Sequence, residues 1–287
     1  MDRDRKELTF VRTGREIEKE FSLWARWRAR LRATVIWVLY PLVSLFEAPK
    51  PSRTSLRVIL YHHVFDDQRE NFRSQLAYLS SRFDFVDIGE FLELLSGRKE
   101  LRGRKLLFTF DDGFKDNITN ALPILEEFGI KAVFFVSTGF VSLTEKEVEK
   151  HWHYAREVFH VGRPVENLSW SDVTELARRG HTVGSHTTTH RQLSNLSAAE
   201  VARELNTSRS VLEQKSGRPV MDMSFPYGRR DDYRPDLTDL ARRAGYRSCF
   251  NMIRGENLPG QDPYFINRDA LEAGWPLIQV KFFMKKK

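Results

Sequence analysis

Residues 105–113 read Lys-Leu-Leu-Phe-Thr-Phe-Asp-Asp-Gly. The apolar run predicts a buried strand, and Asp111 and Asp112 follow at its carboxyl end. Two adjacent carboxylates in such a place are costly to desolvate unless a positively charged group binds them. Gly113 allows a sharp turn, which would let both acids face one site. The alternative is an ordinary loop in which Asp112 only caps the next helix.

Similar apolar runs recur from residue 56 onward, and helical patterns separate them. Strands are expected at residues 57–61, 83–87, 105–110, 131–136, 181–184, 222–225, 246–250 and 264–267. Helices are expected at residues 71–81, 88–96, 117–128, 170–179, 197–216, 236–244 and 274–283. This alternation predicts an α/β fold, a distorted or incomplete (β/α) barrel of about seven to eight parallel strands. Ser197 followed by Glu200 predicts a capping box at the start of the longest helix.

A histidine pair follows the strand expected at residues 181–184, in the sequence Ser-His-Thr-Thr-Thr-His. The i, i+4 spacing predicts that His186 and His190 lie on one side of a helical turn, which suits two imidazoles on one metal ion. Two isolated surface histidines are the alternative, and the acid pair at another strand end favours a shared site instead. Two imidazoles and Asp112 form a facial ligand set typical of zinc, with open positions for water.

Two further motifs follow expected strands. In residues 224–228, Ser-Phe-Pro-Tyr-Gly, the proline has no N–H and the glycine permits an unusual turn. The Tyr227 N–H is therefore expected to face a bound anion, with a plain turn as the alternative. The first strand ends in Leu-Tyr-His-His at residues 60–63, and a histidine there is a candidate for acid–base chemistry. Side-chain alternation predicts that only one of His62 and His63 reaches the site. The alternative is one packed and one exposed histidine.

Together these motifs resemble the polysaccharide deacetylase family, the NodB-homology domain of carbohydrate esterase family four. The resemblance is carried by residues 109–113, 185–190 and 225–228, within a region from about residue 56 to about residue 268. It implies metal-dependent hydrolysis of N-acetyl groups on the amino sugars of a glycan or glycolipid, with release of acetate. Zn²⁺ would be the metal, with Co²⁺, Ni²⁺ or Mn²⁺ as alternatives. A non-catalytic glycan-binding protein of the same fold is the alternative function.

The resemblance also implies a role for individual residues. Asp111 would be the general base that takes a proton from the attacking water. Asp112, His186 and His190 would hold the metal ion. The backbone N–H of Tyr227 would stabilise the oxyanion.

Two positions depart from the family pattern. Many relatives carry an arginine where this chain has Ser224, which we interpret as a difference between branches. The late Leu-x-His motif of the family is absent, and no histidine follows His190. The same pattern occurs early, at residues 60–62, which resembles a circularly permuted branch found among bacterial exopolysaccharide deacetylases. His62 would then be the general acid, and Leu60 would line the acetyl pocket.

The composition excludes some functions. The net charge is +7, but the basic residues concentrate at the two ends of the chain, a pattern that favours an anionic membrane surface over nucleic acid. The single cysteine, Cys249, excludes an internal disulfide and any site with several thiolates. It lies in an apolar run, so we expect a buried structural thiol.

The first fifty residues are expected to form a basic amphipathic helical extension, followed by the deacetylase domain at residues 51–287. The apolar residues at three- and four-residue steps are Phe21, Trp24, Trp27, Leu31, Val35 and Val38. Residues 33–46 are uncharged, but a helix of that length reaches only about 21 Å, against about 30 Å for the hydrocarbon core. Residues 21–46 are therefore expected to lie on a membrane surface. Docking of this face on the protein's own domain, in a cytoplasmic protein, is the alternative.

Overall fold

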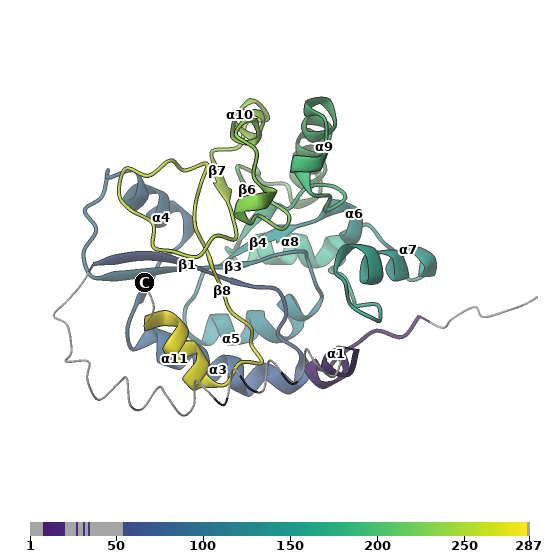
Figure 1. Cartoon of the computed structure of the whole chain (residues 1–287), viewed down its shortest axis with the longest axis horizontal. Helices are drawn as coiled ribbons and strands as arrows, with labels where there is room; N and C mark the ends of the chain where they lie inside the picture. The colour runs from purple at the N-terminus through teal and green to yellow at the C-terminus, as the bar shows by residue number, and fades with distance from the viewer. Residues whose placement is uncertain (1–7, 21–26, 28–30, 32–33, 35–53, 286–287) are drawn as a thin grey trace, which may run out of the picture.

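The centre of the molecule is a curled parallel sheet (Figure 1). The computed structural model describes residues 8–20, 27, 31, 34 and 54–285. Its strands are β1 (Ser55–Tyr61), β2 (Asp84–Phe85), β3 (Arg104–Phe110), β4 (Val133–Val136), β5 (Thr182–Ser185), β6 (Asp222–Ser224), β7 (Ser248–Phe250) and β8 (Asp269–Ala270). Their order across the sheet is β7-β6-β5-β4-β3-β1-β8, and β2 pairs with β3 outside this path. The predicted distorted (β/α) barrel is confirmed.

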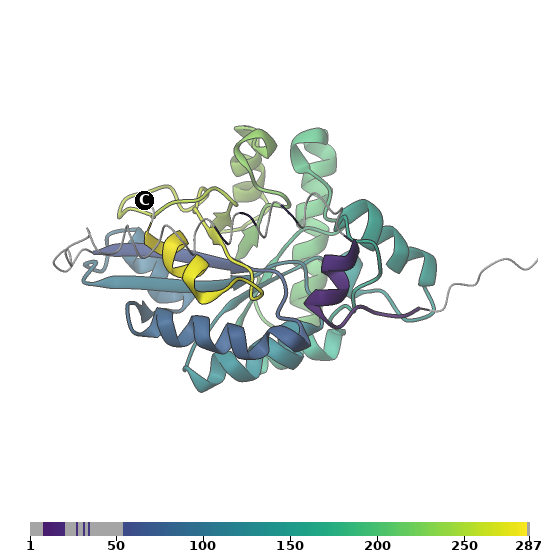
Figure 2. The same cartoon turned by 60° about the horizontal axis from the view of Figure 1, so that its bottom comes forward.

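Helices surround the curled sheet, and α9 and α10 lie on the opposite side from α3 and α5 (Figures 1 and 2). The helices are α1 (Gly14–Glu20), α3 (Arg69–Ser80), α4 (Ile88–Leu95), α5 (Leu122–Glu127), α6 (Thr138–Val141), α7 (Val148–His153), α8 (Trp170–Arg178), α9 (Ala198–Ser216), α10 (Asp236–Arg243) and α11 (Leu277–Lys285). Short turns include the 3-10 turn η1 (Asp66–Gln68) and the π-helical turns η2 (Asn117–Ala121) and η3 (Tyr154–Val158). The predicted capping box is confirmed, because the Glu200 N–H donates to Ser197 Oγ and the Ser197 N–H donates to the Glu200 carboxylate.

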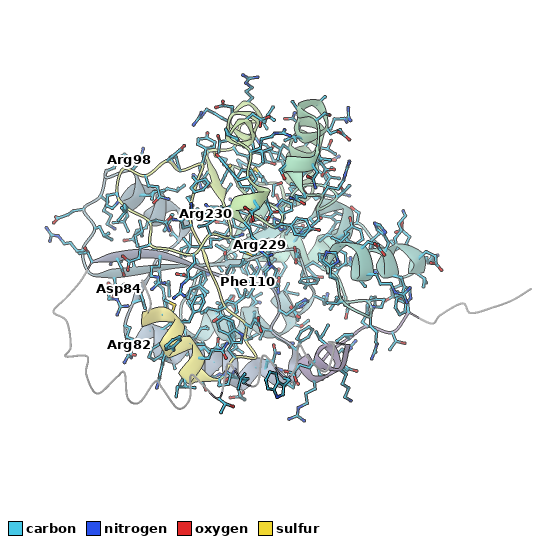
Figure 3. All side chains as sticks on the ribbon, viewed as in Figure 1. Arg82, Asp84, Arg98, Phe110, Arg229 and Arg230 are labelled. Atoms are coloured by element: carbon cyan, nitrogen blue, oxygen red, sulfur yellow. The ribbon has the colours of Figure 1, made fainter. Side chains whose placement is uncertain are left out.

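Alternating residues of the strands pack on two sides of the sheet. On the outer side, the ring of Phe110 stacks between Tyr61 and Phe134, with centroids 5.8 and 5.1 Å away. Figure 3 shows Phe110 at the centre of the molecule, with charged side chains such as Arg98 at its periphery. On the inner side, apolar residues of β1, β3 and β4 form a separate buried cluster with Phe91 of α4. The central strands are thus held between two packed layers. The predicted buried thiol, Cys249, is also confirmed.

The seam of the barrel differs from the prediction. The last strand, β8, lies beyond the segment 264–267 that was expected to form it. The reason is that the side chain of Asn257 donates to the carbonyl of Asn267 and accepts from its N–H, at 3.1 and 2.8 Å, which removes this residue from a strand ladder. Ile266 forms only an isolated bridge with β7. β8 pairs in parallel with β1, so the first and last strands are neighbours.

Residues 8–20 pack against the loops at the carboxyl edge of the sheet. The Val11 N–H donates to the carbonyl of Pro164 at 2.9 Å, and the Asp66 N–H donates to the carbonyl of Arg12 at 3.0 Å. Val11 and Ile17 are buried in a cluster with aromatic residues of these loops. Figure 2 shows α1 near α3. Most of the stretch predicted to lie on a membrane, residues 21–46, is outside the described residues, and no described helix has the length and apolar character of a membrane span.

Candidate active site and metal centre

The carboxyl ends of β1, β3, β5 and β6 bring the predicted site residues to one edge of the sheet. Leu60 of β1 pairs with Thr109 of β3, and the Asp111 N–H donates to the carbonyl of Tyr61 at 3.1 Å. Continuing this register by two residues places His62 beside Asp111. Side chains two residues apart share a face, so His62 and Asp111 follow the inward-facing Leu60 and Thr109. Two motifs whose paired residues are 49 positions apart in the sequence therefore meet at neighbouring strand ends.

Asp112, His186 and His190 form a buried cluster whose ligand atoms all lie within 4.8 Å of one another. Asp112 Oδ1 lies 3.3 Å from His186 Nε2 and 3.0 Å from His190 Nε2. Burial raises the pKa of Asp112, but the two nearby imidazoles lower it by a larger amount. The pKa of this carboxyl therefore lies well below its usual range. The carboxylate is therefore ionised and available as a ligand.

The residues of this cluster fit a divalent cation. Asp112 Oδ1 is buried and, among the described residues, has no hydrogen-bond partner. A buried carboxylate oxygen without a donor is costly unless a cation neutralises it. His186 Nδ1 lies 2.9 Å from the carbonyl of Ser224, which can only accept a hydrogen bond. His186 Nδ1–H therefore donates to this carbonyl and Nε2 faces Asp112, where a cation could bind both groups, the orientation typical of a metal-bound imidazole.

The backbone at the site is strained. Five described non-glycine residues have positive φ, and three are site residues: Asp112 at 76°, His190 at 57° and Tyr227 at 63°. Left-handed conformations of such residues cost roughly 1–3 kcal/mol each and persist where the surrounding structure imposes them, commonly at functional sites. A fourth, Thr187 at 65°, lies in the histidine motif. The strain therefore concentrates on three motifs that the sequence singled out.

The helical turn predicted for the histidine motif is wrong. Residues 186–190 form a loop, and the left-handed residues within it bring the rings of His186 and His190 to a centroid distance of 4.8 Å. Glu204 of α9 fixes this loop, since its carboxylate accepts from the N–H groups of Thr188 and Thr189 at 2.9 Å each. The hydroxyl of Thr189 also donates to Glu204 at 2.6 Å. Sequence reasoning did not identify Glu204.

Asp111 lies on the inner side of the barrel and is held by Arg268, which sequence reasoning also missed. Arg268 Nη1 and Nη2 donate to the two carboxylate oxygens at 2.8 Å each, and both side chains are buried. Ser224 Oγ accepts from Arg268 Nη2 at 2.6 Å and donates to Asp111 at 3.2 Å. Burial raises the pKa of Asp111, but the Arg268 guanidinium lowers it by a larger amount, so the pKa lies below its usual value. The small residue at position 224 leaves room for this arginine from the barrel seam.

The two adjacent histidines lie in different environments. Burial lowers the pKa of His62, while the nearby Asp112 and Asp111 carboxylates raise it by less. His63 instead points into an aromatic layer, where its ring contacts Phe114 at a centroid distance of 3.8 Å. Its Nδ1 lies 2.8 Å from Asp116 Oδ2. His63 is thus packed against an aromatic ring, and the role of His62 stays a prediction.

Tyr227 and Leu60 lie near the other candidate site residues. The ring of Tyr227 lies next to the candidate metal ligand His190, with the two ring centroids 5.3 Å apart. In the described part of the chain its backbone N–H makes no hydrogen bond. Leu60 is fully buried on the inner side of β1, two residues before His62. The roles expected of these two residues stay predictions.

Comparison with known proteins gives the same family. The model of the family described as "Polysaccharide deacetylase" matches residues 98–249. The poly-beta-1,6-N-acetyl-D-glucosamine N-deacetylase of Staphylococcus aureus (strain MRSA252) is 25% identical over 210 residues, which cover 70% of this chain and 66% of the relative. This chain thus matches about two thirds of that protein.

Solved structures agree. IcaB from Ammonifex degensii has a TM-score of 0.65 and 26% identity, covering 81% of this chain and 98% of the other. The BpsB deacetylase domain from Bordetella bronchiseptica, at 20% identity, shares the fold with a TM-score of 0.63, covering 78% of this chain and 98% of that domain. The chain belongs to the polysaccharide deacetylase family, hydrolases that act on carbon–nitrogen bonds other than peptide bonds.

Proposed function

We propose that this protein removes N-acetyl groups from the amino sugars of a polysaccharide in a metal-dependent reaction. The observation that carries the proposal is the convergence of Asp112, His186 and His190, with ligand atoms within 4.8 Å, beside a buried Asp111–Arg268 pair. Three buried ligands and a separate ionised carboxylate are the groups that metal-assisted amide hydrolysis needs. The name of the staphylococcal relative supports a polymer of N-acetylglucosamine as the first substrate to test.

Asp112, His186 and His190 would hold the ion, most simply Zn²⁺, because one carboxylate and two imidazoles suit it. Co²⁺, Ni²⁺ and Mn²⁺ are alternatives for the same ligand set. When bound, such an ion supplies Lewis acidity and makes water acidic enough to attack at neutral pH.

The chain's own groups perform the proton transfers. Asp111 takes a proton from the attacking water, and its two bonds to Arg268 hold the carboxylate in one orientation. The Tyr227 N–H donates to the developing oxyanion, an interaction worth about 3 kcal/mol per donor in other enzymes. Once protonated, His62 transfers its proton to the leaving nitrogen, since an amide nitrogen is a poor leaving group as an anion. Leu60 would line the pocket that holds the acetyl methyl group.

Acetate release from N-acetylglucosamine oligomers tests the proposal. Purified protein stripped with a chelator should release no acetate, and adding back Zn²⁺ or Co²⁺ should restore the release. Binding of the oligomer without acetate release under any metal would favour the non-catalytic glycan-binding alternative.

The segment at residues 21–46 would attach the protein to an anionic membrane surface. Trp27 and Leu31 support this, because both are large apolar residues with exposed fractions of 59% and 46%. A membrane-attached enzyme could also act on a lipid-linked sugar, the second candidate substrate. Trp27→Gln/Leu31→Gln should reduce co-sedimentation with vesicles that contain anionic lipid. The matched control is Leu258→Gln, which changes a leucine that is 64% exposed on the folded domain. Wild-type protein that does not sediment with the vesicles would favour a cytoplasmic protein, and a double variant that sediments as the control does would show that Trp27 and Leu31 make no membrane contact.

A further inference from the structure

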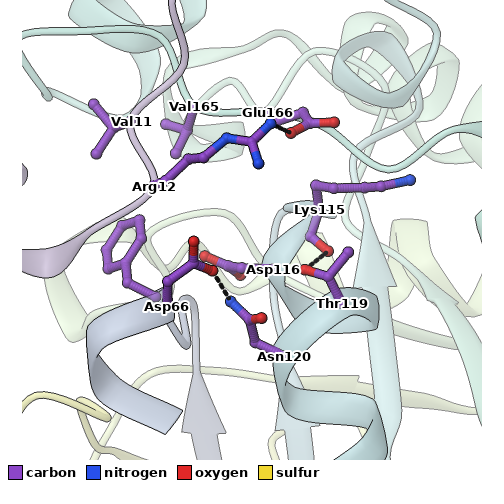
Figure 4. Close-up of a pocket in the computed structure, with 10 residues that line it drawn as sticks. Val11, Arg12, Asp66, Lys115, Asp116, Thr119, Asn120, Val165 and Glu166 are labelled. Carbon is purple, nitrogen blue, oxygen red and sulfur yellow. Dashed lines mark hydrogen bonds and ion pairs between the residues drawn. The ribbon is translucent and has the colours of Figure 1, made fainter.

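A cavity of about 310 Å³ lies beside the catalytic edge and contains none of the site residues described above. We call it the rim pocket; its walls are residues 11–12, 65–66, 115–116, 119–120 and 165–166. Figure 4 shows Arg12 and Glu166 on one side and Asp66 and Asn120 on the other. A volume of this size lies at the lower end of the range for small-molecule sites.

The rim pocket belongs to the same edge of the sheet as the catalytic groups. Asp66 follows β1 and Asp116 follows β3, and the carboxyl ends of parallel strands meet at one edge. Asp116 comes four residues after Asp112, so their Cα atoms are separated by at most about 14 Å. Asp116 also contacts His63, the neighbour of His62. A glycan chain with one unit at the metal centre could therefore place another unit in the pocket.

The lining suits a polyhydroxylated ring rather than a strongly charged ligand. Lys115 is paired with Asp172 at 2.6 Å, and Arg12 lies 3.8 Å from Glu166. The lining carries three carboxylates, those of Asp66, Asp116 and Glu166, against these two paired cations, which disfavours a simple anion. Carboxylate, guanidinium, amide and hydroxyl groups together offer acceptors and donors for sugar hydroxyls, which do both. The apolar parts of the wall, from valine and phenylalanine side chains, would face the C–H groups of a ring.

One wall of the pocket is supplied by the N-terminal segment and is firmly fixed. The backbone bonds of residues 11 and 12 to the loops are supplemented by a bond from the Gly14 N–H to Asp67 Oδ1 at 2.8 Å. Val11 and Ile17 of this segment are also buried in a cluster with aromatic side chains of the loops. The pocket is therefore preformed, which lowers the entropy lost on binding.

We propose that the rim pocket is a subsite that holds a sugar unit of the glycan at a distance from the unit being deacetylated. This inference rests on the proposed function and deepens it, because it makes substrate binding depend on the length of the glycan. Longer oligomers would reach the pocket and gain binding free energy there, whereas short substrates would not. The pocket side chains would therefore affect substrates according to their length.

The test compares N-acetylglucosamine oligomers of increasing length with a small aryl acetate. The variant Arg12→Gln/Glu166→Gln removes two charged groups of the pocket with little change in size. For long oligomers we expect KM to rise roughly tenfold, as expected for losing one or two charge-assisted hydrogen bonds. Turnover of the aryl acetate should be unchanged. The matched control is Glu100→Gln/Arg102→Gln, an exposed ion pair outside the pocket, which should leave every substrate unaffected.

A second variant keeps the test valid if the first variant does not fold. Thr119→Trp adds bulk at an exposed position of the pocket wall and should produce the same length-selective rise in KM. If wild-type protein shows no preference for longer oligomers, or if both variants retain it, the subsite is wrong while the proposed function stands. If wild-type protein with metal releases no acetate from any oligomer or from the aryl acetate, the proposed function itself fails.

Discussion

The guanidinium of Arg268 donates to both carboxylate oxygens of Asp111 at 2.8 Å, although 157 residues separate the two in the sequence. The pair is buried on the inner side of the barrel. A buried carboxylate that must accept a proton needs a fixed orientation, and two parallel bonds from a planar guanidinium provide one. Arg268 thus acts on the reaction through Asp111, as a positioning residue.

Replacing Arg268 should reduce both stability and turnover. Arg268→Met leaves a buried carboxylate without its partner, which typically costs about 3–5 kcal/mol of unfolding free energy. Arg268→Lys keeps the charge but loses the two parallel bonds, so kcat should fall more than KM changes. Urea unfolding and steady-state kinetics measure the two effects. The double variant Asp111→Asn/Arg268→Met should regain part of the stability and none of the activity. A double variant as unstable as Arg268→Met would contradict the pairing as the cause.

Removing either imidazole ligand should remove the metal. We expect His186→Ala and His190→Ala to lose nearly all bound metal, because the two ligands that remain in each variant cannot hold the ion alone. Elemental analysis of purified protein measures the occupancy. His153→Ala, at an exposed histidine of α7, is the control and should keep wild-type occupancy. Full occupancy in both ligand variants would show that the assignment is wrong.

Asp111→Asn should keep the metal and lose turnover. The amide cannot accept a proton from water, and loss of a general base typically lowers the rate by about 10²–10⁴-fold. Metal analysis and acetate release on the same preparation separate the two roles. Retention of most of the wild-type kcat would mean that another residue is the base.

His62→Ala should lower kcat on an amide sharply and on an aryl acetate much less. The leaving amine requires a proton, whereas a phenolate leaves with little help. His63→Ala should affect both substrates alike, because His63 contacts Asp116 and Phe114 in a structural layer. The ratio of the two rates is the measurement. Equal losses for His62→Ala, or a selective loss for His63→Ala, would overturn the assignment of the acid.

A buried histidine far from the catalytic groups should contribute acid sensitivity. Burial, with Lys131 and Arg179 nearby, lowers the pKa of His181 to about 4 from an ordinary value of 6.5. The folded protein thus binds fewer protons here than the unfolded chain. The stabilisation is full above about pH 6.5 and is lost as the pH falls toward about 4, by up to about 3 kcal/mol.

The variant His181→Asn tests this contribution. Asparagine keeps an acceptor for the Ala132 N–H, which donates to His181 Nδ1 at 3.2 Å, but it does not titrate. Urea unfolding at pH 5 and pH 7.5 should show a smaller loss of stability in the variant than in wild-type protein. Equal losses would mean that other groups cause the acid sensitivity.

Local sequence patterns were sufficient for the fold class and most of the candidate site. The run at residues 105–110 predicted β3, and the acids that follow it lie where a parallel strand ends. The Leu-x-His pattern at residues 60–62 was predicted to replace the late motif of the family. The pairing of β1 with β8 agrees with this, because it makes the first and last strands neighbours. These predictions succeeded because burial, alternation and turn residues act over short stretches of chain. The roles of His62, Tyr227 and Leu60 stay predictions that the experiments above test.

The tertiary structure alone decided which residues support the site. Arg268 and Glu204 carry no motif, and each reaches its partner only after the barrel brings distant segments together. The histidine motif has helical spacing but forms a loop, since Glu204 satisfies its backbone N–H groups and permits left-handed residues. Docking of residues 8–20 on the catalytic edge was likewise not predicted as such. A sequence pattern shows that a side chain will be buried, but the partner that neutralises it depends on the path of the whole chain.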